Sequence, residues 1–213
     1  MNDTLAGWLQ ILALVAALAL SFRPLGDYLA YVLTSPRHWR VERVVYRAGG
    51  VDPDADQKWS VFLRGVLAFS LVSVLFLYGF LRLQNHLLLS LGTPAMDADQ
   101  SFNTAASFVT NTNWQSYAGE SALGHLVQMS GLAVQNFVSA AVGMAVAVAL
   151  VRGFARSHTG ELGNFWSDLV RGIVRILLPI AVIGALVLVA CGAIQNFAGI
   201  HEVGQFTGGS QQW

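Results

Sequence analysis

The sequence predicts an all-α integral membrane protein with four transmembrane helices and one re-entrant pore helix that leads into a filter. Of its 213 residues, 54% are hydrophobic and only 11% are charged, whereas soluble domains carry about 25% charged residues. Long uncharged runs alternate with arginine-rich segments, and a polar stretch without internal charges, from Asp99 to Glu120, lies between the second and third runs. These observations predict a span–pore loop–span arrangement.

Each uncharged run is long enough, or nearly so, to cross the membrane as a helix, which takes about 20 residues. The first run is preceded by an acidic residue and not by a basic segment, so we expect a retained helix and not a cleaved signal peptide. Pro179 lies within the fourth run and predicts a kink there. The runs are bounded by Asp3 and Arg23, by Arg64 and Arg82, by Ser121 and Val151, and by Ile176 and His201.

The basic residues predict the orientation. Segments 23–64 and 152–175 hold 11 of the 12 Lys and Arg residues. The positive-inside rule places both segments in the cytoplasm, so the N-terminus, the 82–127 region and the C-terminus are expected outside. Both ends of the polar stretch then lie on the outer side, and the simplest path for that stretch enters the membrane and returns.

Several functional classes are excluded or disfavoured. A net charge of zero gives no reason to expect nucleic acid as a partner, and the single Cys191 excludes a disulfide framework within one chain. The five histidines are scattered, and the acidic turn Asp52–Asp56 lacks the spacing of a calcium loop. We therefore expect no cofactor or metal centre in this chain.

The polar stretch has the composition of a cation filter. Gly92, Thr93 and Pro94 break the chain, and Ser101 or Asn103 is expected to cap a short helix through 104–108. The C-terminal end of that helix, aimed into the membrane, favours a cation. In an extended 110–113 segment, backbone carbonyls could replace the water shell of a monovalent cation. The alternative is an external loop that touches the membrane only through Trp114.

Two further helical segments carry polar side chains. Gln135 and Asn136 are amides within the third span, and we expect them to bond to the back of the pore loop. A stripe of residues at four-residue spacing suits close helix packing; its members are Gly131, Gln135, Ser139, Gly143 and Ala147. Asn164 is expected to cap a short amphipathic helix with Trp166, Asp168 and Arg171, lying at the cytoplasmic interface as an anchor or a docking element.

Residues 107–117 (SFVTNTNWQSY), followed by Gly119 and Glu120, resemble the first selectivity loop of the potassium-binding A subunits of Kdp-type potassium-transporting ATPases. The similarity extends in order along the chain. It includes Arg23–Gly26, Val41–Val44 with Arg47, Gly131–Leu132, Val134–Phe137, and Leu162–Asn164 with Trp166, Asp168 and Leu169.

The resemblance implies a non-catalytic subunit built from four span–pore–span repeats, in a bacterial inner membrane. Such a subunit binds extracytoplasmic potassium, its transported ligand, and delivers it to a P-type subunit that hydrolyses ATP, alongside small accessory membrane subunits. The implied ion ligands are the backbone carbonyls of Thr110, Asn111, Thr112 and Asn113, with Gln115 supporting the loop.

The chain contains one pore loop, whereas an ion must be surrounded by several. We expect residues 1–151 to hold an N-terminal helix and the first repeat, and residues 152–213 to hold a cytoplasmic loop and the first helix of an incomplete second repeat. The resemblance favours a piece of a longer subunit over four assembled copies. Two alternatives of other classes are a stand-alone potassium channel or ion-coupled symporter of the same fold, and a non-transporting membrane scaffold.

Overall fold

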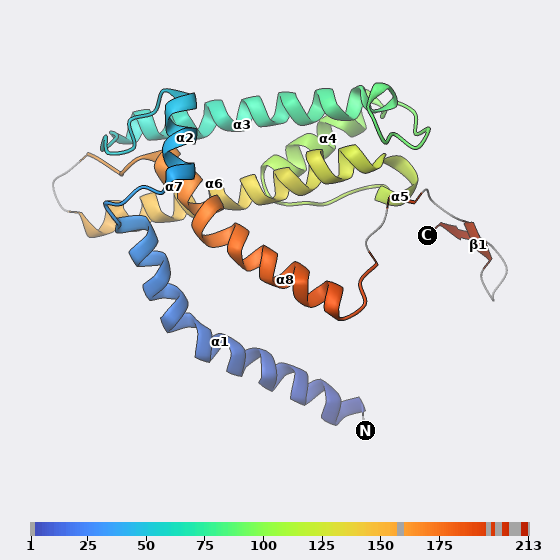
Figure 1. Ribbon diagram of the computed structural model, residues 1–213, viewed down its shortest axis with the longest axis horizontal. Coiled ribbons are helices and arrows are strands. Elements are labelled where there is room, and N and C mark those ends of the chain that lie inside the picture. Colours follow the sequence, from blue (N-terminus) through green and yellow to red (C-terminus); the bar gives the residue numbers. More distant parts are fainter. Residues whose placement is uncertain (1–2, 157–159, 195–196, 199–201, 205–209, 213) are drawn as a thin grey trace.

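The computed structural model describes residues 3–156, 160–194, 197–198, 202–204 and 210–212. Its secondary structure is almost entirely helical (Figure 1). The α-helices are α1 (Asp3–Thr34), α2 (Arg40–Gly49), α3 (Trp59–Arg82), α4 (Ala98–Val109), α5 (Gly119–Ala122), α6 (Val134–Ala155), α7 (Phe165–Arg171) and α8 (Leu178–Ala190). A 3₁₀ turn, η1 (Gln84–His86), and two π-helical segments, η2 (Val127–Ala133) and η3 (Gly172–Leu177), join some of them.

Among the residues that the structure describes, four continuous helical segments are long and apolar enough to cross a membrane, which confirms the predicted all-α membrane fold. They are Thr4–Thr34, Trp59–Arg82, Val127–Ala155 and Phe165–Ala190. A short antiparallel pair, formed by β1 (Glu202–Gly204) and β2 (Ser210–Gln212), was not predicted. The outward orientation of the N-terminus stays a prediction.

The first helix is longer than its uncharged run. It continues through Arg23 and Pro24 to Thr34, so the charge and the proline do not end it. Proline inside a membrane helix is tolerated where neighbouring groups satisfy the backbone. The extra turns carry Tyr28 and Val32 to the other helices, and α1 contacts η3 and α7 there.

Pro179 stands at the start of α8, directly after the π-helical segment η3. Proline has no N–H, so the carbonyl four residues earlier, that of Arg175, loses its usual helical donor. The hydroxyl of Tyr28 donates a hydrogen bond to this carbonyl at 2.7 Å. A π-helical segment therefore precedes Pro179, and the carbonyl that the proline leaves free is bonded by α1. The kink expected at Pro179 stays a prediction.

One core surrounds α4, which packs between α3 and α6 (Figure 1). Its fully enclosed members include Leu77, Leu81, Ala105 and Leu123. The loop after α5 passes very close to the segment before α4, since a Cβ on Gly124 would lie 2.7 Å from the Cα of Ser90. A glycine is required at this contact, because real Cβ atoms do not approach backbone so closely.

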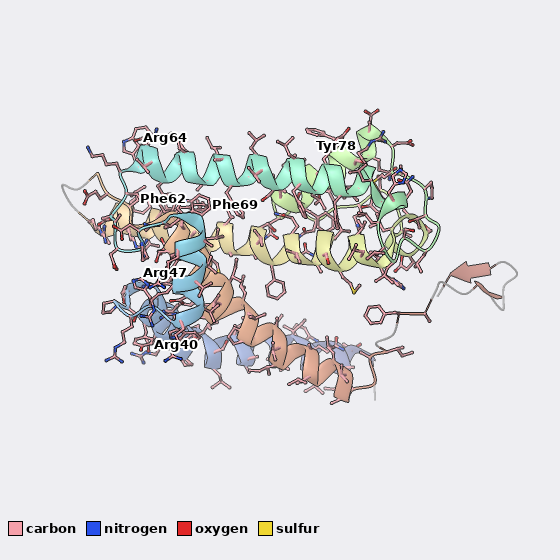
Figure 2. The ribbon with its side chains drawn as sticks, turned by 45° about the horizontal axis from the view of Figure 1, so that its top comes forward. Arg40, Arg47, Phe62, Arg64, Phe69 and Tyr78 are labelled. Atoms are coloured by element: carbon pink, nitrogen blue, oxygen red, sulfur yellow. The ribbon has the colours of Figure 1, made fainter. Side chains whose placement is uncertain are left out.

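A second core lies at the opposite end of the bundle. Phe165 is completely buried and makes edge-on ring contacts with Phe62 and Phe69 of α3, at centroid distances of 5.6 and 6.1 Å (Figure 2). Helix α7, expected at the membrane interface, is instead enclosed by protein, with Asp168 only 3% exposed. The side chain of Asn164 does cap it, accepting hydrogen bonds from the backbone N–H groups of Trp166 and Ser167.

Buried arginines join the segments at this end. Arg152 pairs with Asp168 through two hydrogen bonds, and Arg175 pairs with Glu42 of α2, which is fully buried. Arg171 donates to the Ser35 carbonyl at 2.8 Å. Arginines that the positive-inside count treats as topology signals thus also tie α1, α2, α6 and α7 together. Burial at this junction raises the pKa of the Tyr46 phenol above its ordinary value of 10.0.

The two basic segments lie at the same end of the bundle, as the orientation argument requires. Asp56 of the acidic turn pairs with Arg156 at 2.8 Å and accepts a hydrogen bond from the Gly163 N–H. The backbone of Gln57 also bonds with Gly163 and Leu162. The acidic turn therefore fastens one inter-helix segment to the other, and among the described residues no cluster of His, Cys, Asp or Glu could hold a metal ion.

Candidate functional site

The pore helix is α4, and it starts earlier than the sequence suggested. It runs from Ala98 to Val109 with Asp97, not Ser101 or Asn103, at the N-cap position. Ser101 lies within the first turn, and its hydroxyl donates to the Met96 carbonyl at 3.3 Å. The cap was misplaced because any of several polar residues in this stretch can precede a helix.

The backbone N–H groups of the four residues after α4 donate hydrogen bonds to carbonyls in the last turn of that helix. The N–H of Thr110 bonds to the Ala106 carbonyl, that of Asn111 to Phe108, and those of Thr112 and Asn113 both to Ser107, at 3.0 to 3.3 Å. Within the part of the chain that the structure describes, the carbonyl oxygens of Thr110 to Asn113 accept no hydrogen bond. These oxygens remain available to a ligand.

The backbone of this segment is not extended, contrary to the expectation. Asn111 and Asn113 have φ angles of 60° and 56°, whereas Thr110 has φ −83°. Asparagine tolerates the left-handed region better than other residues with a side chain. In a regular strand, successive backbone carbonyls point in alternating directions. A positive φ at every second residue, as at Asn111 and Asn113, can cancel this alternation and turn neighbouring carbonyls toward the same side.

Ser107, in the last turn of α4, holds the segment in place. Its hydroxyl donates to the Trp114 carbonyl at 3.0 Å, and its own carbonyl accepts from the Thr112 hydroxyl at 3.0 Å. The Thr112 hydroxyl also lies 3.1 Å from that of Thr110. Ser107 is 2% exposed. One buried residue thus fixes both ends of the 110–114 segment.

The loop also bonds to the third span. The hydroxyl of Ser139 in α6 donates to the side-chain oxygen of Asn111 at 3.2 Å. Ser139 is the thirteenth residue of the Val127–Ala155 span, about 18 Å from its start at about 1.5 Å per residue. Asn111 is therefore level with the interior of the span, which matches a re-entrant loop and not one that lies outside the membrane.

The predicted supporting residues lie around the loop without bonding directly to it. The amide of Gln115 donates to the Tyr117 hydroxyl at 3.3 Å, and Tyr117 accepts from Thr104 of α4 at 3.2 Å. Gln135 is buried in α6 and Asn136 is exposed. Neither of these two side chains has a hydrogen bond to the loop among the described residues, so their supporting role stays a prediction.

Sequence reasoning missed Ser107 and Ser139 as structural contacts of the loop. Ser139 lies on the same stripe as Gln135, and the small residues of that stripe predict close helix packing. A hydroxyl one turn from a buried amide, within a membrane span, was the available signal. Ser107 belongs both to the expected short helix and to the 107–117 loop motif, but neither predicts its bond to the Trp114 carbonyl, because nothing in the sequence shows that the chain folds back over it.

Two long helices enclose a short pore helix and a segment whose backbone carbonyls accept no hydrogen bond among the described residues. This arrangement defines the class of span–pore loop–span membrane proteins. The family described as potassium-transporting ATPase A subunit matches residues 12–213, and this chain belongs to that family. The membership confirms the resemblance that the loop motif indicated.

Named relatives agree with this assignment. The potassium-transporting ATPase potassium-binding subunit of Streptomyces avermitilis is 70% identical over 213 residues, covering 100% of this chain and 38% of the relative. The subunit of the same name from Streptomyces coelicolor is 68% identical with the same coverage. That of Mycolicibacterium smegmatis is 63% identical over 204 residues, covering 95% of this chain and 36% of the relative. The chain thus spans under two fifths of their length.

Proposed function

We propose that this chain forms part of the potassium-binding and translocating subunit of an ATP-driven potassium uptake complex. The backbone carbonyls of Thr110, Asn111, Thr112 and Asn113 contribute one side of a potassium site. Potassium is the transported ligand, and no catalytic step takes place on this chain.

The observation that carries the proposal is the free carbonyl segment at the end of α4. Its N–H groups are all engaged by the helix end, and its carbonyls have no partner among the described residues. The C-terminal end of a helix also carries about half a negative charge. Unpaired carbonyls beside this partial charge suit a dehydrated monovalent cation, whereas divalent cations usually need carboxylates.

One loop supplies one side of such a site, so other loops must complete it. We propose that residues 1–151 hold an N-terminal helix and the first of several span–pore–span repeats, and that residues 152–213 hold a cytoplasmic loop and the first helix of the second. The relatives are named as subunits of a potassium-transporting ATPase, which supports a complex with a P-type subunit that hydrolyses ATP. Small accessory membrane subunits and a bacterial inner membrane location, with the N-terminus outside, belong to the same proposal.

The test is ATP hydrolysis by the purified, assembled complex as potassium is varied. We expect hydrolysis to rise with potassium, and the half-saturating concentration to increase when a glycine is inserted between Thr112 and Asn113. The insertion shifts the following carbonyl out of register while leaving α4 intact. Hydrolysis that ignores potassium would contradict a pump, and passive potassium flux without any partner would favour a channel or symporter. If the insertion changes neither affinity nor flux, the loop is a packing element of a scaffold.

A further inference from the structure

A cavity of about 400 Å³ lies where α1, the 35–39 segment and η3 meet, remote from the pore loop. Aromatic and cationic side chains line it together, and none of its lining residues is acidic. These aromatic and cationic lining residues are Tyr28, Tyr31, Arg37, His38, Trp39 and Arg175. Tyr and Trp gather at the membrane–water boundary in membrane proteins. Helix α1, and α8 after η3, both carry large apolar side chains that are exposed in this chain.

Arg175 gives the cavity a directed hydrogen-bond donor. Its side chain is only 3% exposed. Its Nε and Nη2 bond to Glu42, Nη2 also donates to the Arg37 carbonyl at 2.7 Å, and its guanidinium lies 4.8 Å from the centre of the Trp39 ring. Its Nη1 has no hydrogen-bond partner among the described residues. This nitrogen is also not one of the fully enclosed unpartnered atoms, which are Gln84 Oε1 and Arg171 Nε.

The charges around the cavity do not cancel. Glu42 neutralises Arg175, and Asp168 neutralises Arg152. Arg171 and the exposed Arg37 form no ion pair with any described carboxylate. Of these two, only Arg37 lines the cavity, and the exposed carboxylate of Asp54 lies 3.0 Å from the ring of His38, another lining residue. One unpaired arginine therefore lies beside the Arg175 donor that lacks an acceptor, and an anion with several acceptor oxygens would match these two donors.

We propose that this cavity binds the phosphate headgroup of an anionic phospholipid. The phosphate accepts from Arg175 Nη1 and from the Arg37 guanidinium, while Tyr31 and Trp39 lie at the level of the glycerol. The acyl chains lie along the exposed apolar residues of α1 and α8, such as Leu18 and Ile183. A lipid fits better than a free anion, because the lining residues Tyr28, Tyr31 and Arg175 belong to two of the helical segments that are long and apolar enough to cross a membrane, and none of the lining residues belongs to the pore loop.

Native mass spectrometry of the assembled complex tests the proposal, with phosphatidylglycerol and phosphatidylcholine offered in equal amounts. We expect bound phosphatidylglycerol to exceed bound phosphatidylcholine, and Arg37→Gln to weaken its retention about fivefold, as expected for one cation near a lipid surface. Arg40→Gln is the matched control. It removes an exposed arginine from α2, three residues along (Figure 2), that does not line the cavity.

Three results would overturn the proposal. One is equal loss of lipid in the Arg37 and Arg40 variants, which would mean a diffuse charge effect. Another is displacement of phosphatidylglycerol by inorganic phosphate at matched concentration, which would indicate a free-anion site. The third is the absence of any retained lipid in the unmodified complex, as when another part of the transporter fills the cavity. The side chain of Arg37 is exposed, and its substitution leaves the backbone carbonyl that Arg175 uses, so the variant should fold.

Discussion

At the residue scale, Asn113 separates a carbonyl site from a side-chain site. Its φ of 56° is available to glycine without strain, whereas alanine in this region costs about 1–2 kcal/mol. Both substitutions remove the same hydrogen bond to Asn111. If carbonyls bind the ion, Asn113→Gly should keep near-normal potassium affinity, and Asn113→Ala should weaken it about 5- to 30-fold.

The measurement is the half-saturating potassium concentration for ATP hydrolysis by the complex. Equal losses in the two variants would point to the asparagine amide as the ligand and would contradict a carbonyl site.

Ser107 makes a second prediction at this scale. Ser107→Ala removes the hydroxyl that bonds to the Trp114 carbonyl, so the loop should lose about 1 kcal/mol of stabilisation and the complex about fivefold in potassium affinity. Ser121→Ala is the control, because its hydroxyl is exposed and bonds only to the Ala118 carbonyl of its own turn. A Ser121 variant that is as weak as the Ser107 variant would show that the effect is general to the outer loop.

At the element scale, Tyr28 and Pro179 should be energetically coupled. Tyr28→Phe removes the donor to the Arg175 carbonyl and should lower the free energy of unfolding by about 1 kcal/mol. In a Pro179→Ala background the residue at 179 regains its N–H and can donate to that carbonyl, so the same Tyr28 substitution should cost less.

Denaturant unfolding of the four proteins of this cycle in micelles gives the coupling energy, which we expect to be about 0.5 kcal/mol or more. Additive effects would mean that the Tyr28 hydroxyl does not compensate for the proline.

The sequence predicted an element well where neighbouring residues alone determine it, and less well where contacts with distant segments do. Uncharged runs predicted all four spans, since crossing a membrane depends on the hydropathy of about 20 successive residues. The ends of the elements were predicted less well. Whether α1 stops at Arg23 or continues to Thr34, and whether α7 lies at an interface or is buried, depends on partners elsewhere in the chain.

At the scale of the whole molecule, the contacts that the sequence could not predict join distant segments. Arg175 and Glu42 are 133 residues apart, and Asn111 and Ser139 are 28 apart. The periodicity of hydrophobic residues along the chain does not indicate which distant residues form such pairs. That the polar stretch after α4 packs against the spans was predictable, because polar residues without charge are costly inside a membrane unless protein or water surrounds them, and its function as a pore loop stays a prediction. Its left-handed asparagines were not predictable from the same argument.

The most direct test of the account is a crystal structure of the assembled complex with rubidium in place of potassium, located by anomalous scattering. The account predicts a rubidium peak bounded on one side by the carbonyl oxygens of Thr110 to Asn113. Ordered rubidium elsewhere in the transporter, with these four oxygens bonded to protein or facing lipid, would contradict it.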